Sequence, residues 1–439
     1  MTRSIMPRGL ALAGGLLWIV AAGAGGCGRD DDTRQVIRVT RNIGGREGFR
    51  LHFEAWKAAF ERDNPGWKMD LIDLGDSQGA EYYKSRIATD DLPEIVMTWQ
   101  LTNFLADGGH LIPLSDAFYD KFGIPLPPPY KGKRYTSQGG IQVQGIAINK
   151  RMWHDAGITE PPATWDDFVA ALHKIKARGH KPLVYGGREW SAHMPLFYAI
   201  ATNMYDVKPD PNKPSWTRLM DQRKVRFASD PTARLIVGKM IDLLDNFVGK
   251  GALSDGYNEE QRDFYGGKGA TWMMGCWMAG DVEPYQVDFE IEYWPIPSMT
   301  GRPPLLIDTS TFQSGWAITT SATGQRLDKA RAALEAFYDP HVYQCYLNGE
   351  SMFKLAANVA VDGPKSDWPA AQHLFDSMAA TTAKVASTVG FHIGLDDIPP
   401  SGWSMTMART MQEILSGNKD VDKLLKMLDD DWDSARKGM

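Results

Sequence analysis

Tryptophan beside a polar side chain recurs where predicted strands end. Trp99 and Gln100 follow one short buried strand, and Glu189 and Trp190 follow an extended run that closes at the Gly186-Gly187 turn. The face of an indole packs against the C–H groups of a sugar ring, while a neighbouring amide or carboxylate bonds its hydroxyls. These pairs therefore point to noncovalent binding of a hydroxylated ring. Simple packing of each tryptophan is the alternative.

A glycine-containing turn follows the first predicted strand. It runs from Arg41 to Gly48 and includes Gly44, Gly45 and Arg46. Its backbone amides and the Arg46 guanidinium can donate hydrogen bonds to hydroxyls. Loops after the carboxyl ends of strands line the binding crevice of open α/β sheets, which favours a ligand contact here. A plain turn is the alternative.

Signatures of the common enzyme and cofactor classes are absent from the sequence. Gly267-Lys268 is followed by Gly269 and lacks the upstream glycine of a phosphate-binding loop. There is no Rossmann fingerprint, zinc-binding His-Glu-x-x-His motif or nucleophile elbow. The nine histidines are scattered singly. We therefore expect no catalytic residue, no cofactor and no metal.

A hydrolase of carbohydrates is the rival from another class. It needs two carboxyls that face one sugar bond, and Glu189 with Asp396 or Asp397 is the candidate pair. Adjacent acids such as Asp396 and Asp397 do not meet that geometry by themselves, so a solvated charge is the simpler interpretation of each.

The amino-terminal segment has the layout of an export signal. Arg3 and Arg8 precede an apolar stretch, and small residues from Ala24 lead to Cys27. We expect residues 1–26 to be a lipoprotein signal peptide, Cys27 to carry the lipid and residues 27–34 to be a tether. The protein would be exported and anchored at the periplasmic or extracellular face of a membrane. An ordinary signal peptide is the alternative.

Charge, length and cysteine content limit the kinds of partner and the domain organisation that the protein can have. The net charge is −6, and it becomes about −8 when the two arginines of the signal segment are removed, which disfavours nucleic acid as a partner. The chain of 439 residues exceeds what one hydrophobic core usually serves, so two domains are expected. Cys276 and Cys345 could form a disulfide or remain free thiols.

Strands and helices alternate along the chain. Residues 36–40, 67–71 and 93–97 read as strands, and a helix between the first two has an aromatic stripe at Phe49, Phe53, Trp56 and Phe60. Thr164 begins a further helix, with Asp167 three residues later in a capping arrangement. This alternation predicts α/β layers.

Several motifs are similar to those of one family. The most specific runs from Gly145 to Trp153 and continues to Pro161-Pro162-Ala163-Thr164-Trp165-Asp166-Asp167-Phe168. Others are the helix that ends Asn64-Pro65-Gly66 with the later Leu92–Val96, the stretch Phe264–Ala270 with Gly275-Cys276-Trp277, and the carboxy-terminal helix pair that contains Gly417. Their order resembles the extracellular solute-binding lipoproteins of ABC importers, in the sugar-binding group typified by maltose-binding protein.

The resemblance implies the type II fold of periplasmic binding proteins, with two α/β lobes joined by crossing segments. We expect the amino-terminal lobe to comprise 35–143 and 313–358, and the carboxy-terminal lobe 146–308 and 365–439. The crossings would lie near 142–145, 309–314 and 356–364. The resemblance also implies a monomer that closes on a mono- or oligosaccharide and delivers it to the transmembrane subunits of an ABC permease. A sugar sensor without transport is a further alternative.

The resemblance adds residues to the expected site. Trp277 matches the stacking tryptophan of the family, with a core tryptophan as the alternative, and Trp403 matches a cleft tryptophan at a helix start. Cys276 stands where the family often has Ser or Pro and could alter the pocket wall. The complete predicted ligand-binding set is Gly45, Arg46, Trp99, Gln100, Glu189, Trp190, Trp277, Asp396, Asp397 and Trp403.

Overall fold

The computed structural model describes most of the chain beyond the predicted tether. The described residues are 34–43, 46–75, 79–98, 101–127, 129–188, 194–205, 216–308, 315–389 and 403–437. Among them, no helix combines the length and the apolar character needed to cross a membrane.

The first sheet is a five-stranded layer with the order β2-β1-β3-β11-β4. Strand β1 runs parallel to β2 and β3, whereas β11 is antiparallel to both of its neighbours. The buried side chains of Ile37, Val39 and Ile95 explain why these short β-branched runs form central strands. The bounds are β1 (Gln35–Arg41), β2 (Trp67–Asp73), β3 (Ile95–Met97), β4 (Leu111–Ile112) and β11 (Trp316–Thr319).

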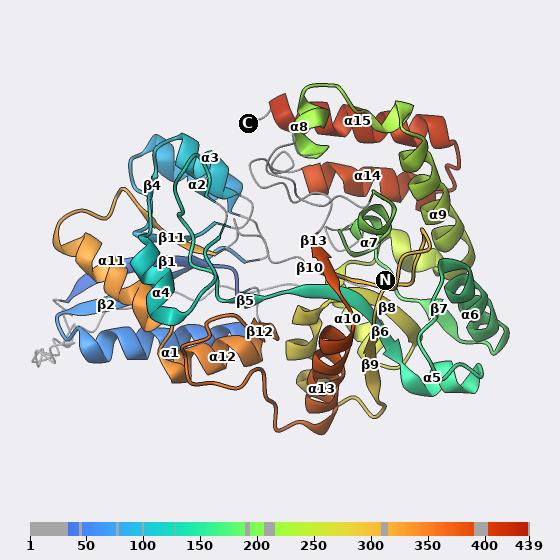
Figure 1. The fold of residues 1–439 in the computed structure, drawn as a ribbon, viewed down its shortest axis with the longest axis horizontal. Helices are drawn as coiled ribbons and strands as arrows, with labels where there is room; N and C mark the ends of the chain where they lie inside the picture. Colours follow the sequence, from blue (N-terminus) through green and yellow to red (C-terminus); the bar gives the residue numbers. More distant parts are fainter. Residues whose placement is uncertain are drawn as a thin grey trace, which may run out of the picture. The chain divides into compact units, whose positions relative to one another are not determined.

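Helices cover both faces of this sheet (Figure 1). On one face, α1 packs beside α12 and buries the predicted aromatic stripe from Phe49 to Phe60. On the other face, a smaller cluster around Tyr83 and Leu105 joins α2 and α3 to the sheet. The bounds are α1 (Glu47–Asp63), α2 (Ala80–Ala88), α3 (Thr102–Asp107), α4 (Asp116–Phe122), α11 (Gln325–Ala336) and α12 (Pro340–Glu350).

The predicted turn from Arg41 to Gly48 was wrong at both ends. Arg41 is the last residue of β1, and α1 already begins at Glu47. The strand continues because Arg41 pairs with Asp73 in the β1–β2 register and its side chain is fully buried.

The second sheet has the order β13-β10-β6-β8-β7, and β9 also pairs with β6. Its central strand β6 is buried along its whole length and is antiparallel to β8, β9 and β10. The bounds are β6 (Val143–Asn149), β7 (Lys181–Leu183), β8 (Gly269–Gly275), β9 (Ile291–Trp294), β10 (Leu306–Asp308) and β13 (Ser387–Val389).

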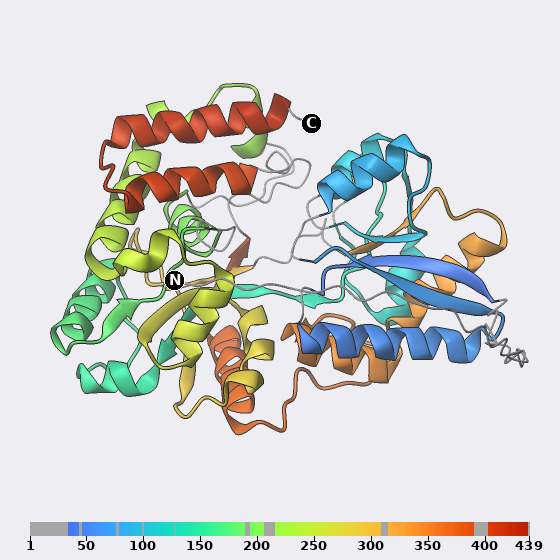
Figure 2. The same cartoon turned by 180° about the vertical axis from the view of Figure 1, so that it is seen from behind.

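The helices of the second layer confirm the local sequence signals. The Thr164 hydroxyl caps α6 by accepting a hydrogen bond from the Asp167 amide at 3.2 Å. Helices α14 and α15 lie side by side near the carboxyl terminus (Figure 2). The bounds are α5 (Lys150–Asp155), α6 (Trp165–Ala177), α7 (Met194–Tyr205), α8 (Trp216–Asp221), α9 (Pro231–Phe247), α10 (Tyr257–Tyr265), α13 (Pro369–Lys384), α14 (Trp403–Leu415) and α15 (Val421–Lys437).

A small antiparallel pair lies where the chain passes between the two layers. Strand β5 (Gly140–Ile141) pairs with β12 (Phe353–Lys354), and β6 of the second sheet begins two residues after β5. The predicted crossing at 309–314 lies outside the described residues, and the lobe boundaries stay a prediction. The short helix η5 (Cys276–Asp281) follows β8 and packs on α12.

Candidate functional site

Most of the predicted ligand-binding residues are not among the residues that the structure describes. Outside the described residues are the predicted lipid-bearing Cys27 and seven of the ligand-binding candidates: Gly45, Trp99, Gln100, Glu189, Trp190, Asp396 and Asp397. Trp403 is described only as the first residue of α14, without its side chain. The structure describes the side-chain surroundings of two predicted contacts, Arg46 and Trp277.

Arg46 is held in a defined orientation at the start of α1. It is the N-cap residue of that helix, and its Nε donates a hydrogen bond to the Ile43 carbonyl at 3.3 Å. The guanidinium carbon lies 3.8 Å from the centroid of the Phe49 ring, a cation–π contact. No described residue accepts a hydrogen bond from its two terminal nitrogens, Nη1 and Nη2. The half-buried side chain thus keeps two donors available.

Trp277 is folded back over the end of strand β8. A Cβ atom on Gly275 would lie 1.9 Å from Cζ3 of the Trp277 ring, so only glycine leaves room for the indole there. The ring is half-buried and packs against the hydrophobic core. This arrangement is compatible with a stacking surface, but a ligand contact at Trp277 stays a prediction.

Asp281, at the end of η5, is a candidate site residue that the sequence did not predict. Its Oδ2 accepts hydrogen bonds from Gln261 Nε2 at 2.6 Å and from the Tyr257 hydroxyl at 3.3 Å. Both donors are buried on α10. No described residue donates to Oδ1. One carboxylate oxygen is therefore fixed and the other is left available.

Burial and nearby charge act on Asp281 in opposite directions. Burial raises the pKa of its carboxyl above the usual value, and among the groups that counter this effect the charge of Arg46 is the strongest. Burial also raises the pKa of Tyr257, whose hydroxyl stays protonated and able to donate.

Three glycines explain how Arg46 and Asp281 come near each other. A Cβ atom on Gly48 would lie 2.6 Å from the Cα of Gly349, and one on Gly280 would lie 2.5 Å from the Gly349 carbonyl oxygen. The backbones of α1, α12 and η5 thus meet at Gly349, without side chains between them. Arg46 lies two residues before Gly48 and Asp281 directly follows Gly280, so both flank this glycine junction.

Arg41 and Glu350 form a buried ion pair next to the Phe49 ring that Arg46 also contacts. Arg41 Nη2 is 2.5 Å from Glu350 Oε1, and both side chains are almost entirely buried. The guanidinium carbon of Arg41 lies 4.6 Å from the centroid of the Phe49 ring and 5.6 Å from that of the Trp316 ring. Burial lowers the pKa of Arg41, and the charge of Glu350 opposes that shift. The pair joins the end of β1 to the end of α12.

The buried residue Glu260 anchors the turn that precedes Glu189 and Trp190 in the sequence. The buried Glu260 carboxylate accepts hydrogen bonds from the Gly186 amide at 2.5 Å and from Trp272 Nε1 at 3.3 Å. Arg188 donates to Glu259 at 3.0 Å, so that cation is engaged on the surface of α10. Glu260 therefore fixes the direction in which the chain leaves β7.

Cys276 does not act as a reactive thiol. Its side chain is fully buried, its sulfur accepts a hydrogen bond from the Val143 amide at 3.5 Å, and burial raises its pKa to about 12. Cys345, half-buried on α12, is also free. The two described cysteines thus form no disulfide. The sulfur of Cys276 is hydrogen-bonded to the backbone of strand β6.

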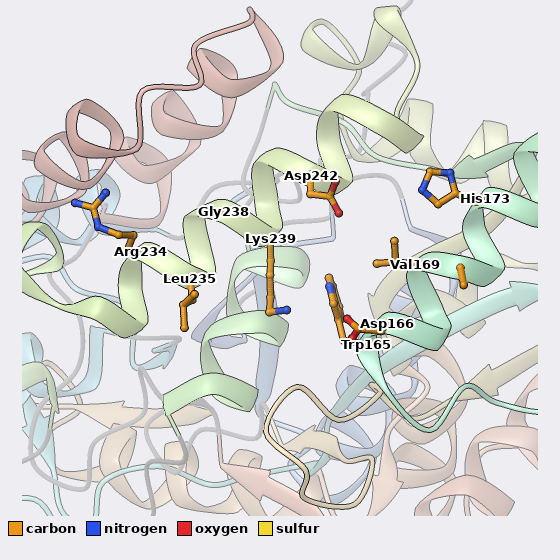
Figure 3. Close-up of a pocket in the computed structure, with 10 residues that line it drawn as sticks. Trp165, Asp166, Val169, His173, Arg234, Leu235, Gly238, Lys239 and Asp242 are labelled. Carbon is orange, nitrogen blue, oxygen red and sulfur yellow. The ribbon is translucent and has the colours of Figure 1, made fainter.

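Two other features of the described residues lie apart from these contacts. A hollow of about 580 Å³ between α6 and α9 is lined by residues that include Val169 and Gly238, and the Lys239 ammonium lies over the Trp165 ring (Figure 3). No predicted ligand-binding residue lines it. The second feature is a group of two acids and a histidine, Glu290, Glu292 and His373. The neighbouring Lys150 ammonium forms an ion pair with each of the two carboxylates.

The two α/β layers and their crossing segments define a class, the two-lobed α/β binding proteins. The chain belongs to the family of bacterial extracellular solute-binding proteins, whose sequence model matches residues 49–343. The fold and family expected from the sequence motifs are thereby confirmed.

Solved structures and sequence relatives agree with this assignment. A chitin oligosaccharide binding protein superimposes with a TM-score of 0.75 at 21% identity and covers 92% of this chain and 100% of its own. A sugar transporter protein from Bacillus licheniformis, solved with stachyose, gives a TM-score of 0.69 at 16% identity, over 91% of this chain and 100% of its own.

In sequence, the matches are partial. A probable sugar-binding periplasmic protein of Mesorhizobium japonicum is 37% identical over 105 residues, which are 20% of this chain and 25% of that protein. The chain spans less than two fifths of the length of the relatives that it matches in sequence. These relatives are named as binding proteins and not as enzymes.

Proposed function

We propose that this protein captures a mono- or oligosaccharide between its lobes and delivers it to the transmembrane permease of an ABC importer. The observation that carries the proposal is the pairing of an aromatic ring with an oriented carboxylate on one short element, Trp277 and Asp281 of η5. A pyranose presents a C–H face to the first and hydroxyls to the second. Relatives whose names refer to sugars support the same ligand class.

The remaining parts of the proposal follow from the sequence. Ligand that touches both lobes would select the closed form, which the permease reads. The predicted contacts outside the described residues, from Gly45 to Asp397, would line the same cleft. The proposed lipid on Cys27 would keep a monomeric receptor near its permease and raise its effective concentration there. No step of this cycle needs catalysis.

Calorimetric titration with a panel of sugars tests the ligand class. We expect one of chitotriose, raffinose, stachyose or maltotriose to bind with a stoichiometry of about one per chain and with no product detectable by chromatography. Release of shorter sugars would favour the hydrolase that uses Glu189 with Asp396 or Asp397. Absence of binding by every member of the panel would refute the carbohydrate proposal.

Trp277→Ala tests the aromatic contact. Loss of a stacking ring should weaken affinity for the bound sugar by about tenfold or more, since an aromatic contact contributes on the order of 1 kcal/mol beyond its buried area. The thermal unfolding of the ligand-free variant should stay close to that of the unmodified protein. Trp368→Ala is the control, because Trp368 is also half-buried, precedes α13 and is not one of the predicted ligand-binding residues. A large loss of ligand-free stability would show that Trp277 is a core residue.

A further inference from the structure

Arg46 and Asp281 are two oriented groups of opposite charge that do not bond each other. Arg46 is anchored through Nε and the Phe49 ring, and its terminal nitrogens are unused. Asp281 is anchored through Oδ2 by Gln261 and Tyr257, and its Oδ1 is unused. Long side chains pay rotamer entropy when they are ordered, so prior anchoring lowers the cost of a later contact.

The two groups come from different layers but meet at one place. Arg46 precedes α1 of the first layer, whereas Asp281 ends η5 of the second, and both flank the glycine junction at Gly349. The charge of Arg46 reaches Asp281, yet no ion pair forms between them. A ligand group that reaches both side chains would therefore meet atoms that no described residue bonds.

The chemistry of the unused atoms specifies that group. The guanidinium nitrogens only donate hydrogen bonds, and the carboxylate oxygen only accepts them. A hydroxyl does both, so two neighbouring hydroxyls on one ring satisfy the donor side and the acceptor side together. A carboxylate on the ligand would be repelled by Asp281, and an ammonium by Arg46, so the balanced pair favours a neutral ligand.

We propose that Arg46 and Asp281 form a clamp that bonds neighbouring hydroxyls of a neutral sugar from both lobes at once. The clamp deepens the proposed function and rests on it. Asp281 is the specificity-determining residue of the pair, with Gln261 and Tyr257 as positioning residues that aim its free oxygen. Arg46 supplies charge-assisted donors.

Matched substitutions test the clamp with whichever sugar of the panel binds the unmodified protein. Asp281→Asn and Arg46→Gln should each weaken binding by about tenfold or more, since hydrogen bonds to charged groups contribute more than neutral ones. Glu283→Gln and Arg50→Gln remove the same charges from exposed positions nearby and should leave affinity within about twofold. Thermal unfolding of each ligand-free variant checks that it is folded.

The double variant measures whether the two residues act through one ligand. If both residues bond the same ring, their effects on affinity are coupled. The fold-loss of sugar affinity in Arg46→Gln/Asp281→Asn should then be smaller than the product of the two single fold-losses, by about threefold or more. Single variants that bind as tightly as their controls would overturn the clamp and leave the sugar-binding proposal standing. Absence of binding by the unmodified protein to every sugar of the panel would overturn both.

Discussion

Two arginine–carboxylate pairs lie close together in this protein and differ in what surrounds them. Arg41 and Glu350 are buried and 2.5 Å apart. Arg46 and Asp281 are half-buried and keep unused hydrogen-bonding atoms. Desolvation penalises a buried charge unless its partner is in direct contact, whereas charges near solvent can remain apart. Burial thus distinguishes the pair that holds the fold from the two residues that are available to a ligand.

Local sequence explains the difference. Arg41 ends a strand whose side chains alternate between faces, and it points into the aromatic layer of Phe49 and Trp316. Arg46 lies five residues later, at the N-cap of α1, and its half-buried guanidinium also lies over the Phe49 ring. One phenylalanine thus packs against both guanidinium groups.

The largest expected effect comes from breaking the buried pair. Glu350→Gln leaves the Arg41 charge buried without a counter-charge and should lower the free energy of unfolding by about 3–5 kcal/mol. Urea denaturation of the ligand-free protein measures this value. Glu335→Gln is the control, because Glu335 pairs with Lys121 on the surface, and its loss should cost less than about 1 kcal/mol. Equal effects of the two substitutions would contradict a structural role for the Arg41–Glu350 pair.

A third arginine–carboxylate pair is intermediate between these two in its burial. Asp431 on α15 is buried and bonds Arg409 on α14, which is 60% exposed. Burial raises the pKa of Asp431 to about 6 from its usual 3.8. Between those pH values the folded protein holds a proton that the unfolded chain has lost. The contribution of this group to stability therefore rises as pH falls from about 7 toward 4.

Asp431→Asn should remove that pH dependence. The expected difference is about 1–3 kcal/mol between neutral pH and about pH 4, since one unit of pKa corresponds to about 1.4 kcal/mol. Urea denaturation of the variant and of the unmodified protein at both pH values measures it. An unchanged pH dependence in Asp431→Asn would show that other carboxyls dominate in this range.

The smallest expected effect concerns the open pair. Arg46→Gln should change the ligand-free free energy of unfolding by less than about 1 kcal/mol, because the half-buried guanidinium has no ion-pair partner to lose. The same denaturation experiment without sugar measures the value. A loss as large as that of Glu350→Gln would place Arg46 among the residues that hold the fold and erase the contrast.

The helices could be predicted from the sequence because the signals that specify them are local. The aromatic stripe of α1 and the Thr164 cap of α6 depend on neighbours three or four residues away, and both appear as predicted. The family motifs then gave the two-lobed architecture, which local periodicity cannot supply.

The site was predicted less completely, because its partners are distant in sequence. Asp281 bonds Gln261 and Tyr257, which precede it by 20 and 24 residues and reach it only because β8 brings the chain back past α10. The one signal was an acid four residues after the predicted stacking Trp277. Arg41 was placed in a turn because it follows the β-branched run and precedes Gly44-Gly45. Its partner Glu350 is 309 residues away in the sequence.

The two described cysteines offer a route to observe ligand capture in solution. Cys276 is fully enclosed, whereas Cys345 is partly open to solvent on α12. A maleimide fluorophore added to the native protein should therefore attach to Cys345 in preference to Cys276, without any substitution in the described residues. Because α12 packs on η5, the label would sit on the helix that meets Asp281 at the glycine junction. A change in the emission of this label during titration would make the labelled protein a sensor of its own ligand.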